Sequence, residues 1–396
     1  MNTAKLSRFV QAPPGWNAQR EIAARFPALA ERYRAVLPQM RSLEARLDAD
    51  EACGRDTSYL RQALAELRWR FEYTADLAGA ERTFDRIVRT AARSGLPSVS
   101  AAGGEGGFGI GTEVWFLEID ASVDHWLAAA ALADGTPPRL LDRVNDPDRL
   151  ISYLDGLLVS RLDRDAVDHR KELNFATANL VRLILQRRPV GYPWHPRLEP
   201  AIRSFIADWQ DPATGFFGAG YELDDRCFRT ADLSMTFHMA RYLDGDIGYW
   251  PQLVDTLIGM REARYPNGWL DEAGMTSHNN YDVAVLFRLG WDKISAEQRR
   301  RAQHELAHLT DWCLTNAIAA DGTIALRAAS ESLPESYYFT IAFLDTVGFF
   351  DPAKRFWTDR PFAGAAEVKA QLETGLSHLD PAQPMARMAR ERLHAS

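Results

Sequence analysis

The feature that most constrains the fold of this chain is a glycine turn that recurs about every 54 residues. Four such turns place glycine beside aromatic or apolar residues: "GGFG" at Gly107, "TGFFG" at Gly215, "NGWLD" at Gly268 and "DGTIA" at Gly322. Gly54 fits the same period, and the remaining expected turn is the polar stretch "SRLDRDAVD", which lacks glycine. A fixed period of this length predicts an array of one repeated supersecondary unit.

Between the later turns, the hydrophobic pattern predicts pairs of helices. "ADLSMTFHMARYL" is followed by "YWPQLVDTLIGMREARY", and "YDVAVLFRLGW" by "SAEQRRRAQHELAHLTDWCLTNAI". The first helix of each pair is apolar on nearly all sides, as expected for a buried inner helix, whereas the second is amphipathic, as expected for an outer helix. Each repeat is therefore predicted to be a helical hairpin.

We predict an all-α (α/α)6 toroid, in which six helical hairpins of about 54 residues form a single domain over residues 1–360. The N-terminal stretch "AARFPALAERYRAVLPQMRSLEARL" is expected to complete the ring, and residues 361–396 to form a C-terminal helical extension packed on it. An open solenoid is the alternative. In a toroid the turns gather at one mouth, where we expect the substrate cavity.

Composition and charge limit the partners. The chain is 46% hydrophobic and 25% charged, which is typical of globular proteins, and its net charge of -8 argues against a nucleic-acid partner. No apolar run is long enough to predict a membrane span, and no signal peptide is recognised. The three cysteines, Cys53, Cys227 and Cys313, form no CxxC pair, so we expect a cytoplasmic protein; the oligomeric state stays open.

Two stretches resemble the terpenoid cyclase and protein prenyltransferase superfamily over Trp209–Trp291. "WQDPATGFFGAG" is similar to its glycine-aromatic repeat. The zinc-bearing β-subunits of prenyltransferases carry D-x-C at the start of an inner helix, and one repeat later a histidine followed by an aromatic residue. The matching residues are Asp225 and Cys227 in "DDRCF", and His278 and Tyr281 in "SHNNYD". The resemblance implies a zinc ion bound by Asp225, Cys227 and His278.

A carboxylate, a thiolate and an imidazole suit tetrahedral zinc and leave a fourth position open for catalysis. At a helix start, Asp225 and Cys227 can both point inward, and the helix N-terminus favours the thiolate. The alternative is structural: Cys227 is a small core residue, Asp224 or Asp225 is an N-cap, and His278 bonds to Asn279 or Asn280.

The chain departs from the prenyltransferases where they hold the isoprenoid diphosphate. Their arginine, lysine and tyrosine are replaced by Ala219, Glu222 and Phe228, although Arg226 and Arg229 can supply cations. Protein prenylation is therefore not predicted. We predict instead a transferase or cyclase for an isoprenoid-like or other apolar small molecule.

The string "ELDD", Glu222–Asp225, also resembles the D-x-D-D motif of class II terpene cyclases. There, an aspartic acid kept protonated among apolar walls donates a proton to an alkene. Aromatic rings can stabilise the cations that follow. The candidate rings belong to Phe216, Phe217, Trp269, Tyr281 and Tyr338.

Two further functions remain as alternatives. "HELAH", His304–His308, fits the H-E-x-x-H pattern of zinc peptidases, with Glu331 or Glu335 as the third ligand. The apolar stripe of that helix lies on the opposite side, so we expect these histidines in solvent. The apolar stripe comprises Ala302, Leu306, Leu309 and Cys313.

The other alternative is a carbohydrate lyase or hydrolase, in which tyrosine, histidine, asparagine and paired carboxylates serve as base, ligands and acid. Its candidate residues are Asp232, Asp282, Glu331, Glu335, Asn279, Asn280, His278 and Tyr281. The stretch "SAAGGEGGFGIG" lacks the ending of a phosphate-binding loop and is predicted to be an enlarged turn. A non-catalytic toroidal scaffold is a further possibility.

The predicted site is thus defined by two sets of residues. The catalytic set is Asp224, Asp225, His278, Tyr281 and Asp282. The substrate-binding set is Phe217, Glu222, Arg226, Asp232, Trp269, Asn279, Asn280 and Tyr338.

Overall fold

The computed structural model describes four long stretches of the chain, which are residues 6–91, 141–186, 192–326 and 332–395, together with Leu117 and Val123. Within them, positions 7–8, 14, 54, 56, 143, 165 and 382 are not described. The predicted turns at Gly54 and Gly107, the loop 98–111 and Glu331 therefore lie outside the described residues.

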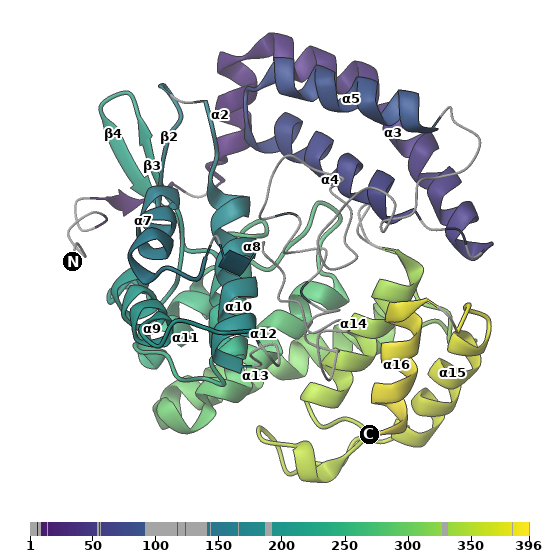
Figure 1. The fold of residues 1–396 in the computed structure, drawn as a ribbon. Helices are drawn as coiled ribbons and strands as arrows, with labels where there is room; N and C mark the ends of the chain where they lie inside the picture. Colours follow the sequence, from purple (N-terminus) through teal and green to yellow (C-terminus); the bar gives the residue numbers. More distant parts are fainter. Residues whose placement is uncertain are drawn as a thin grey trace. The chain divides into compact units, whose positions relative to one another are not determined.

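The chain divides into two compact units. Unit 1 comprises residues 1–209 and 219–230, and unit 2 comprises residues 210–218 and 231–396. Both are mainly helical where they are described, as predicted (Figure 1). Among the described residues, no helix combines the length and the apolar character needed to cross a bilayer.

Unit 1 contains helices from the N-terminal half of the chain and a small sheet. Its helices are α2 (Ala18–Arg25), α3 (Pro27–Ala52), α4 (Ser58–Tyr73), α5 (Leu77–Ala91), α7 (Pro147–Leu157), α8 (Arg170–Val181), η4 (Arg182–Gln186) and α9 (Leu198–Trp209). Glu66 on α4 is fully buried and accepts hydrogen bonds from Arg70, Thr83 and Arg86. This cluster ties α4 to α5.

The sheet of unit 1 has the order β1-β4-β3-β2. Its strands are β1 (Val10–Gln11), β2 (Val159–Arg161), β3 (Gly220–Leu223) and β4 (Arg226–Arg229). β3 and β4 form an antiparallel hairpin that pairs Tyr221 with Phe228 and Glu222 with Cys227, while β1 and β2 add in parallel. The all-α prediction misses this sheet, because the "YELDDRCF" stretch forms a hairpin and the following helix begins only at Leu233.

Two properties of the local sequence explain the hairpin. Tyr221 and Leu223 alternate with Glu222, a period of two that suits a strand, and both are buried. Asp224 adopts φ 54 at the turn, in the left-handed region that aspartate tolerates better than most residues. Trp16 packs on the finished hairpin, with its ring centroid 4.6 Å from that of Tyr221 and 5.6 Å from that of Phe228.

Unit 2 consists of helices in two layers. Its elements are α10 (Leu233–Tyr242), α11 (Trp250–Gly259), α12 (Ser277–Gly290), η5 (Trp291–Lys293), α13 (Ala296–Trp312), η6 (Cys313–Ala317), α14 (Leu333–Thr346), η7 (Pro352–Lys354), α15 (Ala365–Ser377) and α16 (Pro384–His394). The first layer is the row α10, α12, α14 and α16, each packed on the next (Figure 1). α11 and α13 pack against each other and against α12, and form the second layer.

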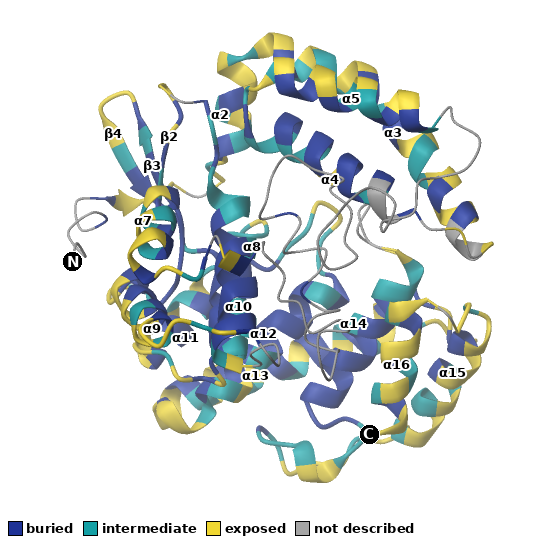
Figure 2. Cartoon of the chain, in the orientation of Figure 1, coloured by how far each residue is buried: buried dark blue, intermediate teal, exposed yellow. Residues whose placement is uncertain are grey.

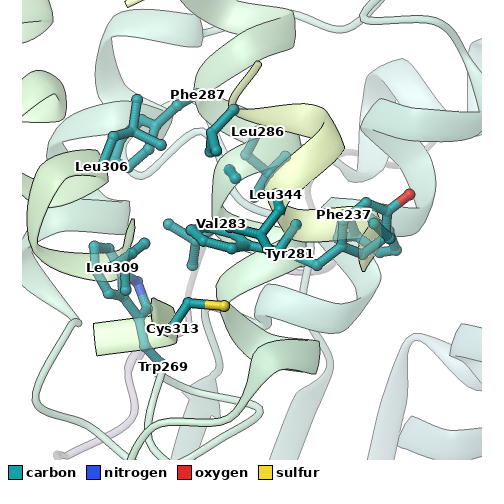
Figure 3. Close-up of a cluster of buried hydrophobic side chains, with 14 of the residues drawn as sticks. Phe237, Trp269, Tyr281, Val283, Leu286, Phe287, Leu306, Leu309, Cys313 and Leu344 are labelled. Carbon is teal, nitrogen blue, oxygen red and sulfur yellow. The ribbon is translucent and has the colours of Figure 1, made fainter. Parts of the chain in front are cut away.

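The expected helix pairs are confirmed in this unit as α10 with α11 and α12 with α13. α12 and α14 are buried along most of their length, whereas α13 alternates between buried and exposed residues (Figure 2). The core between the layers joins Val283, Leu286 and Phe287 of α12 to Leu306 and Leu309 of α13 (Figure 3). The hydrophobic patterns of the two helix classes therefore reflect their different burial.

The helices begin at polar caps that the sequence supplies. Asp232 accepts from the backbone N–H of Met235 at the start of α10, and Thr276 from that of Asn279 at the start of α12. Among the turn glycines, Gly215 has φ +72, and an added Cβ would collide with the backbone of Leu253. This turn therefore requires glycine both for its backbone conformation and for the close approach of α11.

Candidate active site

The hairpin tip does not have the environment that the cyclase interpretation requires. Asp224 is 55% exposed, and its carboxylate accepts from Arg25 at 2.8 Å. Asp225 and Arg226 beside it are exposed as well. A carboxyl group surrounded by water and a guanidinium is not isolated among apolar walls, so the tip is poorly suited to keeping an acid protonated.

Other residues predicted around the hairpin have structural contacts. Cys227 is half-buried on β4, opposite Glu222, whose carboxylate accepts from Arg161 at 3.2 Å. Arg226 lies with its guanidinium 5.3 Å from the ring centroid of Phe228. Arg229 is buried and donates to the carbonyl of Trp209 at 3.1 Å.

Asp225 and Cys227 belong to unit 1, whereas His278 belongs to unit 2. Among the residues that the structure describes, no group of three or more histidine, cysteine, aspartate or glutamate side chains is arranged to hold a metal ion. Zinc bound by Asp225, Cys227 and His278 therefore stays a prediction.

A different group of residues, on α12, has the properties of an active site. His278, Tyr281 and Asp282 are spaced i, i+3 and i+4, which places them on one face of the helix. Asp282 is only 1% exposed, and its Oδ1 has no hydrogen-bond partner among the described residues. Its Oδ2 lies 4.0 Å from Nε2 of His278, too far for a direct hydrogen bond. His278 keeps 41% of its side-chain surface accessible and stacks on Phe339, with ring centroids 4.1 Å apart.

The surroundings shift the pKa values of Asp282 and His278 in opposite directions. Burial raises the pKa of the Asp282 carboxyl well above its usual range, and the positive charge of Arg241 offsets this only in part. The protein around His278 removes water from its charged form and lowers its pKa to about 4, against a weak opposing effect of Glu335 and Asp271. The pair therefore combines an imidazole that is neutral above about pH 4 with a carboxyl group that keeps its proton to a higher pH than usual.

Neighbouring helices complete the wall around this pair. α10 contributes Arg241, whose guanidinium lies 5.8 Å from the ring centroid of Tyr281. α14 contributes Phe339, whose ring centroid lies 5.9 Å from that of Tyr281, and Tyr338, whose ring packs edge-on against Phe339. The site thus combines an acid, a base, a cation and aromatic rings on three adjacent helices.

The fourth helix of the row, α16, adds a second cation. The guanidinium of Arg392 lies 5.5 Å from the ring centroid of Tyr281. Its Nε donates to Asp345 at the end of α14 at 2.9 Å, and Lys354 donates to the same carboxylate at 2.6 Å. Asp345 thereby fixes the guanidinium of α16 against Tyr281.

The remaining predicted residues of unit 2 are buried in structural roles. Asp232 caps α10, and Asn279 donates to the carbonyl of Trp269 at 2.8 Å. Asn280 is fully buried, and neither of its side-chain polar atoms has a partner among the described residues. Phe217 and Trp269 are buried too. Of the predicted set, His278, Tyr281, Asp282 and Tyr338 come together.

The "HELAH" stretch lies on α13, with both His304 and His308 exposed and Glu305 buried. Glu305 accepts from Arg261 at 2.9 Å, and Glu335 is occupied in a capping box with Ser332. The expectation that the two histidines face solvent is confirmed.

Unit 1 contains a groove of about 580 Å³ between α3, α4 and α5. Its lining is mainly apolar, and Arg46 is the one charged residue among the described residues that form it. The groove has no acid–base pair, so the candidate active site remains the α12 cluster.

Three residues of this cluster, Arg241, Phe339 and Arg392, were not predicted. Arg241 interrupts an otherwise apolar helix, which is a signal that the sequence offered. Arg392 lies in the segment expected to be an extension, so nothing in the sequence alone pointed to it.

The chain matches no protein family model, no curated protein and no solved structure. Its function must therefore be inferred from the residues themselves.

Proposed function

We propose that the protein is an acid–base enzyme of the cyclase or isomerase type, acting on a largely apolar, isoprenoid-like small molecule. Asp282 is the proton donor and His278 the proton acceptor. The observation that carries the proposal is the opposite pKa shift of two groups only 4.0 Å apart. A neighbouring carboxyl group that holds its proton more tightly than usual and an imidazole that is less readily protonated can serve as a catalytic acid and base.

The chemistry follows from these protonation states. The Asp282 O–H bond breaks as a C–H bond forms at an alkene carbon, and a cation develops on the substrate. The rings of Tyr281, Tyr338 and Phe339 stabilise it through their π faces. A neighbouring C–H then loses its proton to Nε2 of His278, which restores a neutral product. The proton returns to Asp282 across the 4.0 Å gap by way of a water molecule or the next ligand.

An (α/α)6 toroid is the architecture that we propose for the whole chain. The two-layered helix pairs of unit 2 support it, as do the glycine turns and the resemblance to terpenoid cyclases. The three cysteines, all free thiols, agree with the proposed cytoplasmic location.

A uronate-directed carbohydrate lyase is the second candidate, because Tyr281, His278 and Arg241 suit proton abstraction beside a carboxylate. Asn279, which such a site would use as a sugar ligand, already donates to the carbonyl of Trp269 at 2.8 Å. This contact favours the cyclase proposal.

The test is turnover of isoprenoid alcohols, isoprenoid diphosphates and uronate oligosaccharides by wild type, Asp282→Asn and Asp255→Asn. Asp282→Asn should lower kcat by about 10²–10⁴-fold on the accepted substrate. Asp255, which pairs with Arg301 on the exposed side of α11, is the matched control and should have no effect. Products formed in D2O should carry deuterium at the protonated carbon. Full activity of Asp282→Asn would refute the assignment, and turnover of uronates alone would favour the lyase.

A further inference from the structure

We infer that the substrate carries an anionic group, a carboxylate or a phosphate, and that Arg241 binds it. The inference rests on the proposed function, because it adds a recognition element to the same site.

The position of Arg241 is the first observation. It lies in the last turn of α10, and its guanidinium is 5.5 Å from the ring centroid of Phe237, 5.6 Å from that of Tyr242 and 5.8 Å from that of Tyr281. Rings can accompany a guanidinium, but they do not neutralise its charge.

No carboxylate among the described residues forms an ion pair with Arg241, although it is half-buried. Half-buried charges are normally paired, because removing them from water is costly. The guanidinium therefore lacks a counterion within the described structure.

The cations near Asp345, in contrast, have a carboxylate counterion. Arg392 and Lys354 share the Asp345 carboxylate, at 2.9 Å and 2.6 Å. Asp345 is therefore already shared by two cations, and within the described residues it forms no ion pair with Arg241. A ligand anion at Arg241 would supply the counterion that this guanidinium lacks there.

Guanidinium groups bind carboxylates and phosphates through paired N–H donors. With its anion held there, the apolar part of the substrate can lie on Tyr281 and Phe339, toward Asp282 and His278.

Isothermal titration with inorganic pyrophosphate and with decanoate tests the inference on the full chain. Wild type should bind one of the two probes, and Arg241→Gln should bind it at least about 10-fold more weakly. Pyrophosphate binding identifies a phosphate-bearing substrate, and decanoate binding a carboxylate. Arg301→Gln is the control: Arg301 pairs with Asp255 at 2.8 Å on the exposed side of α13, away from the cluster, and its loss should leave affinity unchanged.

Two further variants distinguish loss of anion binding from loss of folding and from loss of catalysis. Arg241→Lys keeps the charge and should retain part of the affinity, which distinguishes loss of a binding group from loss of folding. Asp282→Asn should still bind the probe even though turnover is lost. Absence of binding of both probes to wild type, or unchanged affinity in Arg241→Gln, would overturn the inference while leaving the acid–base proposal to its own test.

Discussion

At the scale of single residues, the neutral imidazole of His278 makes a definite prediction about pH. Its pKa is about 4 in the folded protein, so the base is available at and above that pH. We expect kcat/KM to fall on acidification only below about pH 4 and to fall at high pH as Asp282 loses its proton. The measurement is a pH profile of kcat/KM, and an acid limb near the ordinary histidine value of 6.5 would contradict it.

The same shift affects stability. Between pH 6.5 and 4 the unfolded chain takes up a proton on His278 that the folded protein does not, so this residue makes the folded state less stable as the pH falls through that range. His278→Gln should flatten the dependence of the unfolding free energy on pH in this range. His304→Gln, at an exposed position on α13, is the control and should not.

At the scale of elements, the hairpin formed by β3 and β4 makes a prediction about Asp224. Its left-handed backbone tolerates Asn but not a β-branched residue. Asp224→Val should lower the free energy of unfolding by about 1–2 kcal/mol, whereas Asp224→Asn should lose only the exposed pair with Arg25, worth up to about 1 kcal/mol. Urea unfolding measures both. Both variants should keep turnover. Loss of turnover in Asp224→Asn would indicate that Asp224, at the hairpin tip, is the proton donor instead of Asp282.

The hairpin also shows that the local sequence does not always decide between a helix and a strand. "DDRCF" satisfies the requirements of a helix start and of a strand after a tight turn, and the pairing with β1 and β2, from residues far away in the sequence, decides between them. The α12 residues were predictable because the spacing of His278, Tyr281 and Asp282 is itself helical. Arg241 and Arg392 meet Tyr281 only through the packing of α10, α12, α14 and α16, which no local pattern encodes.

At the scale of the whole molecule, zinc is the prediction that concerns both units, because Asp225 and Cys227 belong to one and His278 to the other. Elemental analysis of protein purified without a histidine tag tests this prediction, which competes with the role of His278 as proton acceptor. Zinc in wild type and in Cys53→Ser, whose cysteine is exposed, together with its loss in Cys227→Ser and His278→Ala, would make His278 a zinc ligand instead. Wild type that is active without metal would show the zinc prediction to be wrong. Metal retained in both site variants would place the ion elsewhere.

The repeat period was a reliable guide to unit 2 and a weaker one to unit 1. In unit 2 the turns at Gly268 and Gly322 separate helices as expected, because a glycine turn and an amphipathic helix are local signals, whereas the turn at Gly215 leads from α9 into the hairpin of β3 and β4. In unit 1 the helices were expected but the sheet was not, since its strands are short and come from three separate stretches of the chain.

The ion pair between Arg392 and Asp345 has a consequence for the order in which the contacts of unit 2 can form during synthesis. A chain emerging from the ribosome displays α10, α12 and α14 first, yet the guanidinium that lies over Tyr281 is made only when translation reaches α16. Until then Tyr281 lacks this neighbour and Asp345 lacks one of its two cations. The contacts around Tyr281 are therefore complete only after the last helix of the row has been synthesised.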